Sequence, residues 1–208
     1  MIAGGEATLT SCKNSGAITY KVANAPNYYF EGLSVAGVST DAKSLTGRSN
    51  SGKVTVDATA LKGKSTTEDI GIAGIASFAY GVKKCSNTGA ISLNKVYCAG
   101  GVFGYLDAGK KTVSDLYNKG KVTGGGDSKI RAAAIAGYYE VPYSKNTVKN
   151  TYYTFGKGIV NASYVKNQQA KPKKVSSITA KNCSGLSSKY WTYSSKYKRL
   201  VLKNNKEV

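Results

Sequence analysis

The sequence predicts an all-β protein, a parallel β-solenoid (β-helix) of about five irregular coils with a C-terminal cap. The first observation is a repeated motif, which we call the tag: Asn, any residue, Gly, any residue, Ile or Val, and then Thr or Ser. Its four copies begin at Asn14, Asn50, Asn87 and Asn118. The tag glycines, Gly16, Gly52, Gly89 and Gly120, are therefore spaced by 36, 37 and 31 residues. Repeats of this length indicate stacked, equivalent units.

The second observation is a run of small apolar residues before each tag, which we call the box. Its copies are IAGG from Ile2, VAGV from Val35, IAGI from Ile72, CAGGVFGY from Cys98 and AIAGYY from Ala134. The last box is followed by an eroded tag, TFGKGIVN at 154–161, in which the Asn is missing. Because Ala and Gly allow two walls to approach closely, the boxes fit a narrow interior. We expect the coils to occupy residues 1–161.

The third observation is the composition, which favours strands over helices. The chain contains 24 Gly, and its apolar stretches are too short for helices with a 3.6-residue period. Within the tags, Ile18, Val54, Ile91 and Val122 each precede Thr or Ser, a pattern typical of a strand with one buried face. Each unit should therefore consist of short strands separated by corners.

The tag itself predicts a corner between two strands. Gly adopts positive φ at little cost, and Asn bonds readily to its own backbone, so Asn-x-Gly is typical of a sharp turn. Neighbouring coils of a parallel solenoid lie about 4.8 Å apart. We therefore expect the tag asparagines to form a ladder of side-chain amides along one edge.

The boxes and tags resemble the GLUG-type repeat of bacterial surface proteins. The closest likeness is in the fourth unit, where AGGVFGY is followed by TVSDLYNKGKVTG, and the third unit is also similar. The second unit departs from the pattern because its box has a single Gly. The resemblance covers most of residues 1–161. It implies a β-solenoid segment of a secreted or wall-attached, adhesin-like protein, and its motif contains no catalytic residue.

Residues 162–208 differ from the repeats, and we expect a basic loop followed by a cap of the same domain. The tail from Cys183 to Asn204 contains the sole tryptophan, Trp191, and an alternating apolar strand from Leu200 to Leu202. A bulky terminal segment would cover the interior and the free sheet edges that the last coil exposes.

The net charge of +19 is concentrated near the C-terminus. Residues 141–208 hold 14 basic residues and one acid (+13), whereas residues 1–140 hold 16 basic and 10 acidic residues (+6). Such a surface attracts polyanions, although a charge run is also the ordinary solvated face of a soluble protein. The candidate ligand-binding residues are Tyr138, Tyr139, Tyr143, Lys171, Lys173, Lys174, Tyr193, Lys196, Lys198 and Arg199.

The type of basic residue limits what these candidates can recognise. Of the 30 basic residues, three are Arg (Arg48, Arg131 and Arg199), and Arg is the residue that reads base edges and binds phosphates in a bidentate manner. We therefore expect diffuse, salt-sensitive binding and no sequence-specific recognition of nucleic acid.

The four cysteines show no metal-binding spacing, and no His is present. Cys12 and Cys85 both lie two residues before a tag Asn. In coils one and three they would be about 10 Å apart, beyond disulfide reach. We expect four reduced, buried thiols, with a disulfide involving Cys98 as the alternative.

Candidate catalytic residues are not apparent. Without His, acid–base chemistry would depend on 11 scattered carboxylates, whereas glycosidases need two that converge. No apolar run approaches the roughly 20 residues of a membrane-spanning helix. We therefore expect no catalytic site, no metal and no cofactor. The alternative is a β-helical carbohydrate-active enzyme, resembling a polysaccharide lyase or hydrolase, that acts on acidic glycans.

Together these observations predict a non-catalytic segment of a larger bacterial protein, secreted or at the cell surface. It would serve as a stalk or binding module in adhesion. Its expected partners are an anionic glycan, a cell-wall polymer or a host surface protein.

Overall fold

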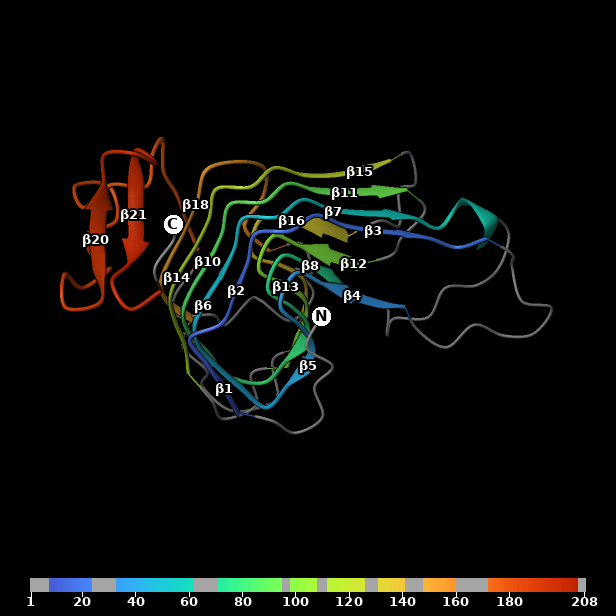
Figure 1. Ribbon diagram of the computed structural model, residues 1–208, viewed down its shortest axis with the longest axis horizontal. Coiled ribbons are helices and arrows are strands. Elements are labelled where there is room, and N and C mark those ends of the chain that lie inside the picture. The colour runs from blue at the N-terminus through green and yellow to red at the C-terminus, as the bar shows by residue number, and fades with distance from the viewer. Residues whose placement is uncertain are drawn as a thin grey trace.

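Successive repeats lie directly over one another in the computed structural model, so that each large sheet collects equivalent segments of consecutive coils (Figure 1). The structure describes residues 8–23, 33–61, 71–94, 98–107, 112–125, 131–140, 148–159 and 172–205. The strands of the four large sheets pair in parallel. Among the described residues, the antiparallel pair is a C-terminal hairpin. The predicted parallel β-solenoid is confirmed.

Two of the sheets flank the tag. The sheet that ends at the tag asparagines, here the Asn sheet, contains β1 (Thr8–Thr10), β2 (Lys13–Asn14), β6 (Ser44–Asn50), β10 (Val82–Asn87), β14 (Val113–Asn118), β18 (Val148–Tyr153) and β19 (Lys173–Lys174). The sheet that follows the tag corner, here the tag sheet, contains β3 (Ile18–Lys21), β7 (Val54–Asp57), β11 (Ile91–Asn94) and β15 (Val122–Gly125). A 3₁₀ turn, η1 (Thr59–Leu61), follows β7.

The other two sheets are built from the boxes. The box sheet contains β4 (Ser34–Ala36), β8 (Gly71–Ala73), β12 (Cys98–Gly100) and β16 (Arg131–Ala133). The next sheet along each coil, which we call the aromatic sheet, contains β5 (Ser39–Ala42), β9 (Ala76–Ala79), β13 (Phe103–Asp107) and β17 (Ala136–Glu140). The hairpin consists of β20 (Trp191–Ser194) and β21 (Arg199–Leu202).

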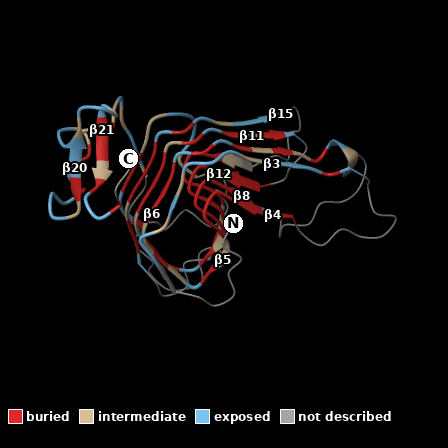
Figure 2. Ribbon diagram, in the orientation of Figure 1, coloured by how far each residue is buried: buried red, intermediate tan, exposed pale blue. Residues whose placement is uncertain are grey.

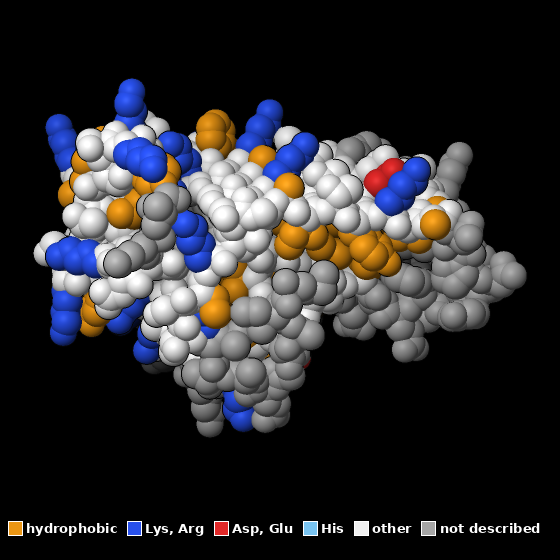
Figure 3. Space-filling view, in the orientation of Figure 1, with side chains coloured by type: hydrophobic (Ala, Val, Ile, Leu, Met, Phe, Trp, Pro, Cys, Tyr) orange, Lys and Arg blue, Asp and Glu red, His pale blue; other side chains and the backbone are white. Residues whose placement is uncertain are grey.

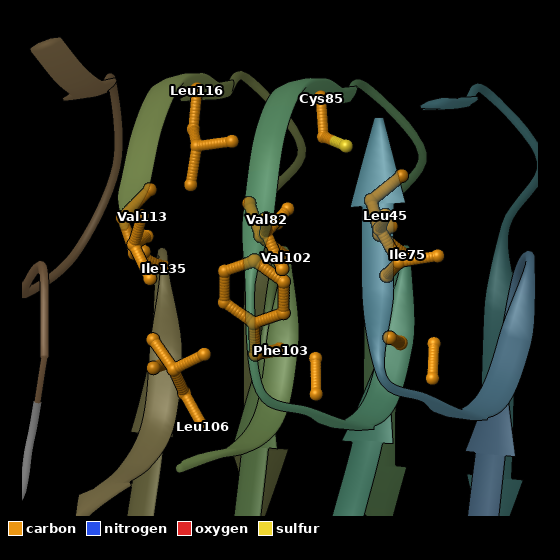
Figure 4. Packing of buried hydrophobic residues seen from close by; sticks show 14 of the residues in the cluster. Leu45, Ile75, Val82, Cys85, Val102, Phe103, Leu106, Val113, Leu116 and Ile135 are labelled. Carbon is orange, nitrogen blue, oxygen red and sulfur yellow. The ribbon is translucent and has the colours of Figure 1, made fainter. Parts of the chain in front are cut away.

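Two apolar clusters fill the solenoid, and Figure 2 shows them as the buried inner positions of the coils. The main cluster lies between the Asn sheet and the aromatic sheet. On the Asn sheet, Leu45, Val82 and Val113 of successive coils stack in register. Box residues at equivalent positions of their coils face them across the interior (Figure 4). The second cluster lies between the tag sheet and the box sheet. Because each coil supplies one layer, no coil buries its apolar face without its neighbours.

The predicted amide ladder is confirmed. Asn14 Nδ2 donates to Asn50 Oδ1 at 2.7 Å, Asn50 Nδ2 to Asn87 Oδ1 at 2.8 Å, and Asn87 Nδ2 to Asn118 Oδ1 at 2.8 Å. Each Nδ2 also donates to the carbonyl of its own tag glycine. Asn50, Asn87 and Asn118 are fully buried, so these bonds satisfy amides that water cannot reach.

The reason for glycine in the tag differs from our prediction. Among the described glycines, positive φ occurs at Gly47 and Gly156 and at none of the tag positions. Instead, a Cβ atom on Gly52, Gly89 or Gly120 would lie 2.0, 1.9 or 2.0 Å from the carbonyl oxygen of the preceding tag glycine. The tag corners therefore need glycine because they stack too closely for any side chain.

Left-handed backbone occurs elsewhere, at one equivalent position of every coil of the Asn sheet. This position is occupied by Ser11 (φ 56°), Gly47 (φ 70°), Lys84 (φ 55°), Asp115 (φ 59°) and Asn150 (φ 49°). The residue at this position is left out of the strand pairing, because Lys83 pairs with Ser114 and the next pair is Cys85 with Leu116. The position is thus a bend that lets two residues only three apart, such as Val82 and Cys85, both face the interior.

The C-terminal segment 172–205, here the strap, lies along the side of the solenoid (Figure 1). We expected the strap to cover the end of the last coil. Only its strand β19 does so, by pairing with β18. The rest covers the outer face of the Asn sheet, because that face carries two large aromatic side chains, Tyr117 and Tyr152, which pack against the strap residues Trp191 and Leu200.

The end of the strap reaches the first coils. Asn205 Nδ2 donates to the carbonyls of Cys12 and Gly47 at 3.3 Å each and to Ser49 Oγ at 3.0 Å. At the other end, Gly185 N donates to Tyr152 Oη at 2.9 Å. The strap therefore spans the stack from the fifth coil to the first.

Candidate binding surface

The strap carries a dense group of exposed positive charges (Figure 3). Its seven lysines are all exposed, and it contains no acidic residue: Lys173, Lys174, Lys181, Lys189, Lys196, Lys198 and Lys203. A buried apolar cluster beneath them holds the strap against the Asn sheet. The charges are therefore presented on a packed scaffold, and a polyanion could neutralise several of them at once.

Part of the predicted binding surface lies here. Lys173 and Lys174 lie on β19, Tyr193 lies on β20, and Lys196 and Lys198 lie in the hairpin turn. The Tyr193 side chain is 52% exposed, which makes it the most accessible aromatic ring of the described residues. These five residues thus share the strap, as the sequence suggested.

Arg199 does not belong to this surface, contrary to our prediction. Its side chain is 5% exposed, and its Nη1 donates to Tyr117 Oη at 2.8 Å and to the carbonyl of Leu200 at 3.3 Å. Tyr117 Oη in turn donates to the same carbonyl at 2.6 Å. Arg199 therefore anchors the strap to the Asn sheet and is withdrawn as a ligand-binding candidate.

Tyr138 lies away from the strap, on the aromatic sheet. Its ring stacks on Tyr105 with centroids 4.7 Å apart, and Tyr105 stacks on Phe78 at 4.8 Å. Stacked rings cover one another's faces, so this column resembles the cross-strand packing of a sheet more than a sugar-binding platform. Tyr139 follows on the same strand, whereas Tyr143 and Lys171 lie outside the described residues. The predicted Lys/Tyr cluster is thus divided between two walls.

Sequence reasoning missed one contact at the edge of the strap. Lys84 Nζ lies 3.3 Å from the centroid of the Tyr190 ring, so the left-handed bend of the third coil directs a lysine onto the strap. A hydrogen bond from Lys84 and the nearby charge of Lys189 lower the pKa of the Tyr190 phenol. No sequence pattern signals this contact, because the two residues are more than 100 positions apart.

The carboxylates of the described residues are dispersed. Asp57 accepts hydrogen bonds from the hydroxyl and the backbone N–H of Thr59, which lower the pKa of its carboxyl group. Asp115 accepts from Asn150 Nδ2 at 2.9 Å and from Ser114 Oγ. Across the described segments, no three metal-ligating side chains gather in a group that could hold an ion.

All four cysteines are free thiols. Cys85, Cys98 and Cys183 are buried, as expected, whereas Cys12 is only half-buried. Cys85 pairs in register with Arg48, and the pairing of Lys13 with Ser49 places Cys12 on the other side of Arg48. The prediction that Cys12 and Cys85 occupy equivalent places two coils apart is confirmed.

We expect Cys12 alone to react rapidly with a thiol reagent such as DTNB at about pH 8. Burial raises the pKa of Cys85 to about 12 and that of Cys183 to about 11, so both stay protonated as well as shielded. Absorbance should show one fast equivalent in the native protein and four in denaturant. Cys12→Ser should remove the fast phase, and a fast phase that survives this substitution would contradict the assignment.

No protein-family model matches the chain, and neither does a curated protein or a solved structure. Within the described segments, none of the helical structure is long and apolar enough to cross a membrane.

Proposed function

We propose that this chain is a non-catalytic, GLUG-type segment of a bacterial secreted or cell-surface protein, which serves as a stalk or binding module in adhesion. Its strap would contact an anionic glycan or cell-wall polymer. The observation that carries the proposal is the set of seven exposed lysines on the strap, without an acidic residue among them.

The chemistry of the strap supports a polymer as the ligand. Lysine ammonium groups are point charges that attract anionic groups without imposing a bidentate geometry. The one arginine of the strap is buried against Tyr117 and so is not offered to a ligand. Binding should therefore depend on charge density and fall steeply with salt, because exposed charges are screened over about 8 Å at physiological ionic strength.

The packing of the strap supports a preformed surface. Trp191 is buried against Tyr117, with ring centroids 5.3 Å apart, and Asn205 fastens the far end to the first coils. A surface held in this way loses little conformational freedom when a ligand binds. The exposed ring of Tyr193 beside the lysines offers an apolar face to a sugar ring.

The test is binding to immobilised heparin and to wall teichoic acid, measured over a range of salt concentrations. The triple variant Lys174→Gln, Lys196→Gln, Lys198→Gln removes three strap charges. Since a lysine near an anionic surface contributes about 1 kcal/mol, binding at low salt should weaken roughly a hundredfold. The matched control is Lys21→Gln, Lys53→Gln, Lys121→Gln, which removes three exposed charges from other parts of the solenoid.

Equal weakening in the two triple variants would show that only the net charge matters and would overturn the strap as the binding surface. Failure of the unmodified protein to bind either polymer at low salt would overturn the proposed function itself.

A further inference from the structure

The interior of the second coil contains one fully buried guanidinium group. Arg48 lies on β6 with no exposed surface, in register with Cys85 and beside the main apolar cluster. Its Nε, Nη1 and Nη2 atoms are all buried, and none of them has a hydrogen-bond partner in the part of the chain that the structure describes. Among the largest fully buried side chains, Arg48 is the one that carries a charge.

This arrangement is costly unless an anion completes it. Arginine side chains keep their positive charge in proteins, whereas a buried lysine can become neutral. An unpaired charge in a low-dielectric interior strongly destabilises the folded state, and the five N–H donors of the guanidinium lose the hydrogen bonds that water gave them. The equivalent position is filled by Cys85, Leu116 and Thr151 in the next three coils, so the fold itself does not require arginine there.

Among the described residues, the neighbours of Arg48 do not supply the missing negative charge. No described carboxylate accepts a hydrogen bond from Arg48. The adjacent thiol of Cys85 stays protonated, because burial raises its pKa. On the other side lies Cys12, a small, half-buried residue of the first coil. A single coil therefore separates Arg48 from the N-terminal end of the Asn sheet.

We propose that Arg48 binds a small monovalent anion, chloride or a short carboxylate such as acetate, inside the first two coils. Small anions are chosen because Arg48 has no exposed surface and its register neighbours, Cys12 and Cys85, have small side chains. A polymer cannot enter it, so this site is independent of the lysines of the strap. The anion accepts hydrogen bonds from the guanidinium and thereby adds a fixed, buried ion pair to the folded state.

The test is the stability of the intact chain in chloride or acetate, with ionic strength held constant by sodium gluconate, whose anion is much larger than either. A ligand that binds only the folded protein lowers the unfolding equilibrium constant about tenfold for each tenfold rise in its concentration above Kd. The unmodified protein should show this response to chloride, to acetate or to both. Comparison of the two titrations shows which anion the site binds. Arg48→Met, which keeps the length of the side chain without its charge, should show none.

A second measurement does not depend on the variant. Crystals of the unmodified protein grown in bromide should give an anomalous peak at hydrogen-bond distance from the Arg48 guanidinium. Parallel responses of the unmodified protein and Arg48→Met, or no response to either anion, would overturn the proposal. If chloride stabilises the unmodified protein, bromide crystals without a peak at Arg48 would overturn it as well. Loss of polymer binding by the strap variant bears on none of these results, so the two proposals can fail separately.

Discussion

Replacement of Asn87 by alanine should lower the free energy of unfolding by about 3–4 kcal/mol, because it breaks the amide ladder at a fully buried rung. Asn87 accepts a hydrogen bond from Asn50 and donates to Asn118 and to the carbonyl of Gly89. After the substitution, these buried partners lose bonds that water cannot replace. Two neighbouring coils are therefore affected together with the coil that carries the change.

The measurement is urea unfolding followed by circular dichroism, and Asn14→Ala is the matched control. Asn14 is the first rung of the same ladder, makes the same bond to its own glycine, and is partly exposed. Its loss should cost only about 1 kcal/mol, since water reaches the groups that it leaves behind. If the two substitutions cost the same, burial of the ladder is not the source of its contribution.

Gly89→Ala should destabilise the protein by about 3 kcal/mol or more, since overpacking that moves backbone exceeds the usual cost of an added methyl group. Its Cβ would lie 1.9 Å from the Gly52 carbonyl oxygen and 2.9 Å from Asn50 Nδ2. The carbonyl belongs to the neighbouring corner, which is itself held by strands on both sides. Relief of the clash would therefore require two coils to separate.

The same change at the first corner provides the control. A Cβ on Gly16 would meet only its own Asn14 Oδ1, at 3.7 Å, so Gly16→Ala should change stability by no more than about 0.5 kcal/mol. Both variants can be compared by thermal and urea unfolding, or by soluble yield if Gly89→Ala does not fold. A mild effect at Gly89 would contradict the close stacking of the corners.

The sequence predicted those features that recur with the repeat. Identical tags must occupy identical places in a stacked array, so the register of Gly16, Gly52, Gly89 and Gly120 and the Asn ladder both followed from spacing. Our prediction of why the tag requires glycine was wrong. Asn-x-Gly suits a left-handed turn as well as it suits close stacking, and the sequence alone does not distinguish these two reasons.

Features that recur in structure but not in residue type were missed. The left-handed bend is occupied by Ser11, Lys84, Asp115 and Asn150, which share neither size nor charge, so no pattern marks it. The stack of coils imposes this conformation on whatever residue stands there, and tertiary packing overrides local preference.

The candidate surface was only partly predictable for a related reason. Lys173, Lys174, Lys196 and Lys198 are near one another in sequence and stay together on the strap. Arg199 is adjacent to them, yet β21 turns it inward onto Tyr117, which lies 82 residues earlier. Tyr138 belongs to a column of rings that local sequence could not distinguish from a ligand platform. Which side of a short strand faces the solenoid depends on long-range contacts.

The attachment of Asn205 to Cys12 joins residues 193 positions apart, whereas the rungs of the ladder join residues 31–37 positions apart. Arrays held only by nearest-neighbour contacts can fray progressively from either end. A tether that reaches from the last described residues back to the first coil couples the two ends, so that loosening of the first coil also disturbs the strap. We therefore expect this long loop to close late in folding, because the coils between must first take up their positions.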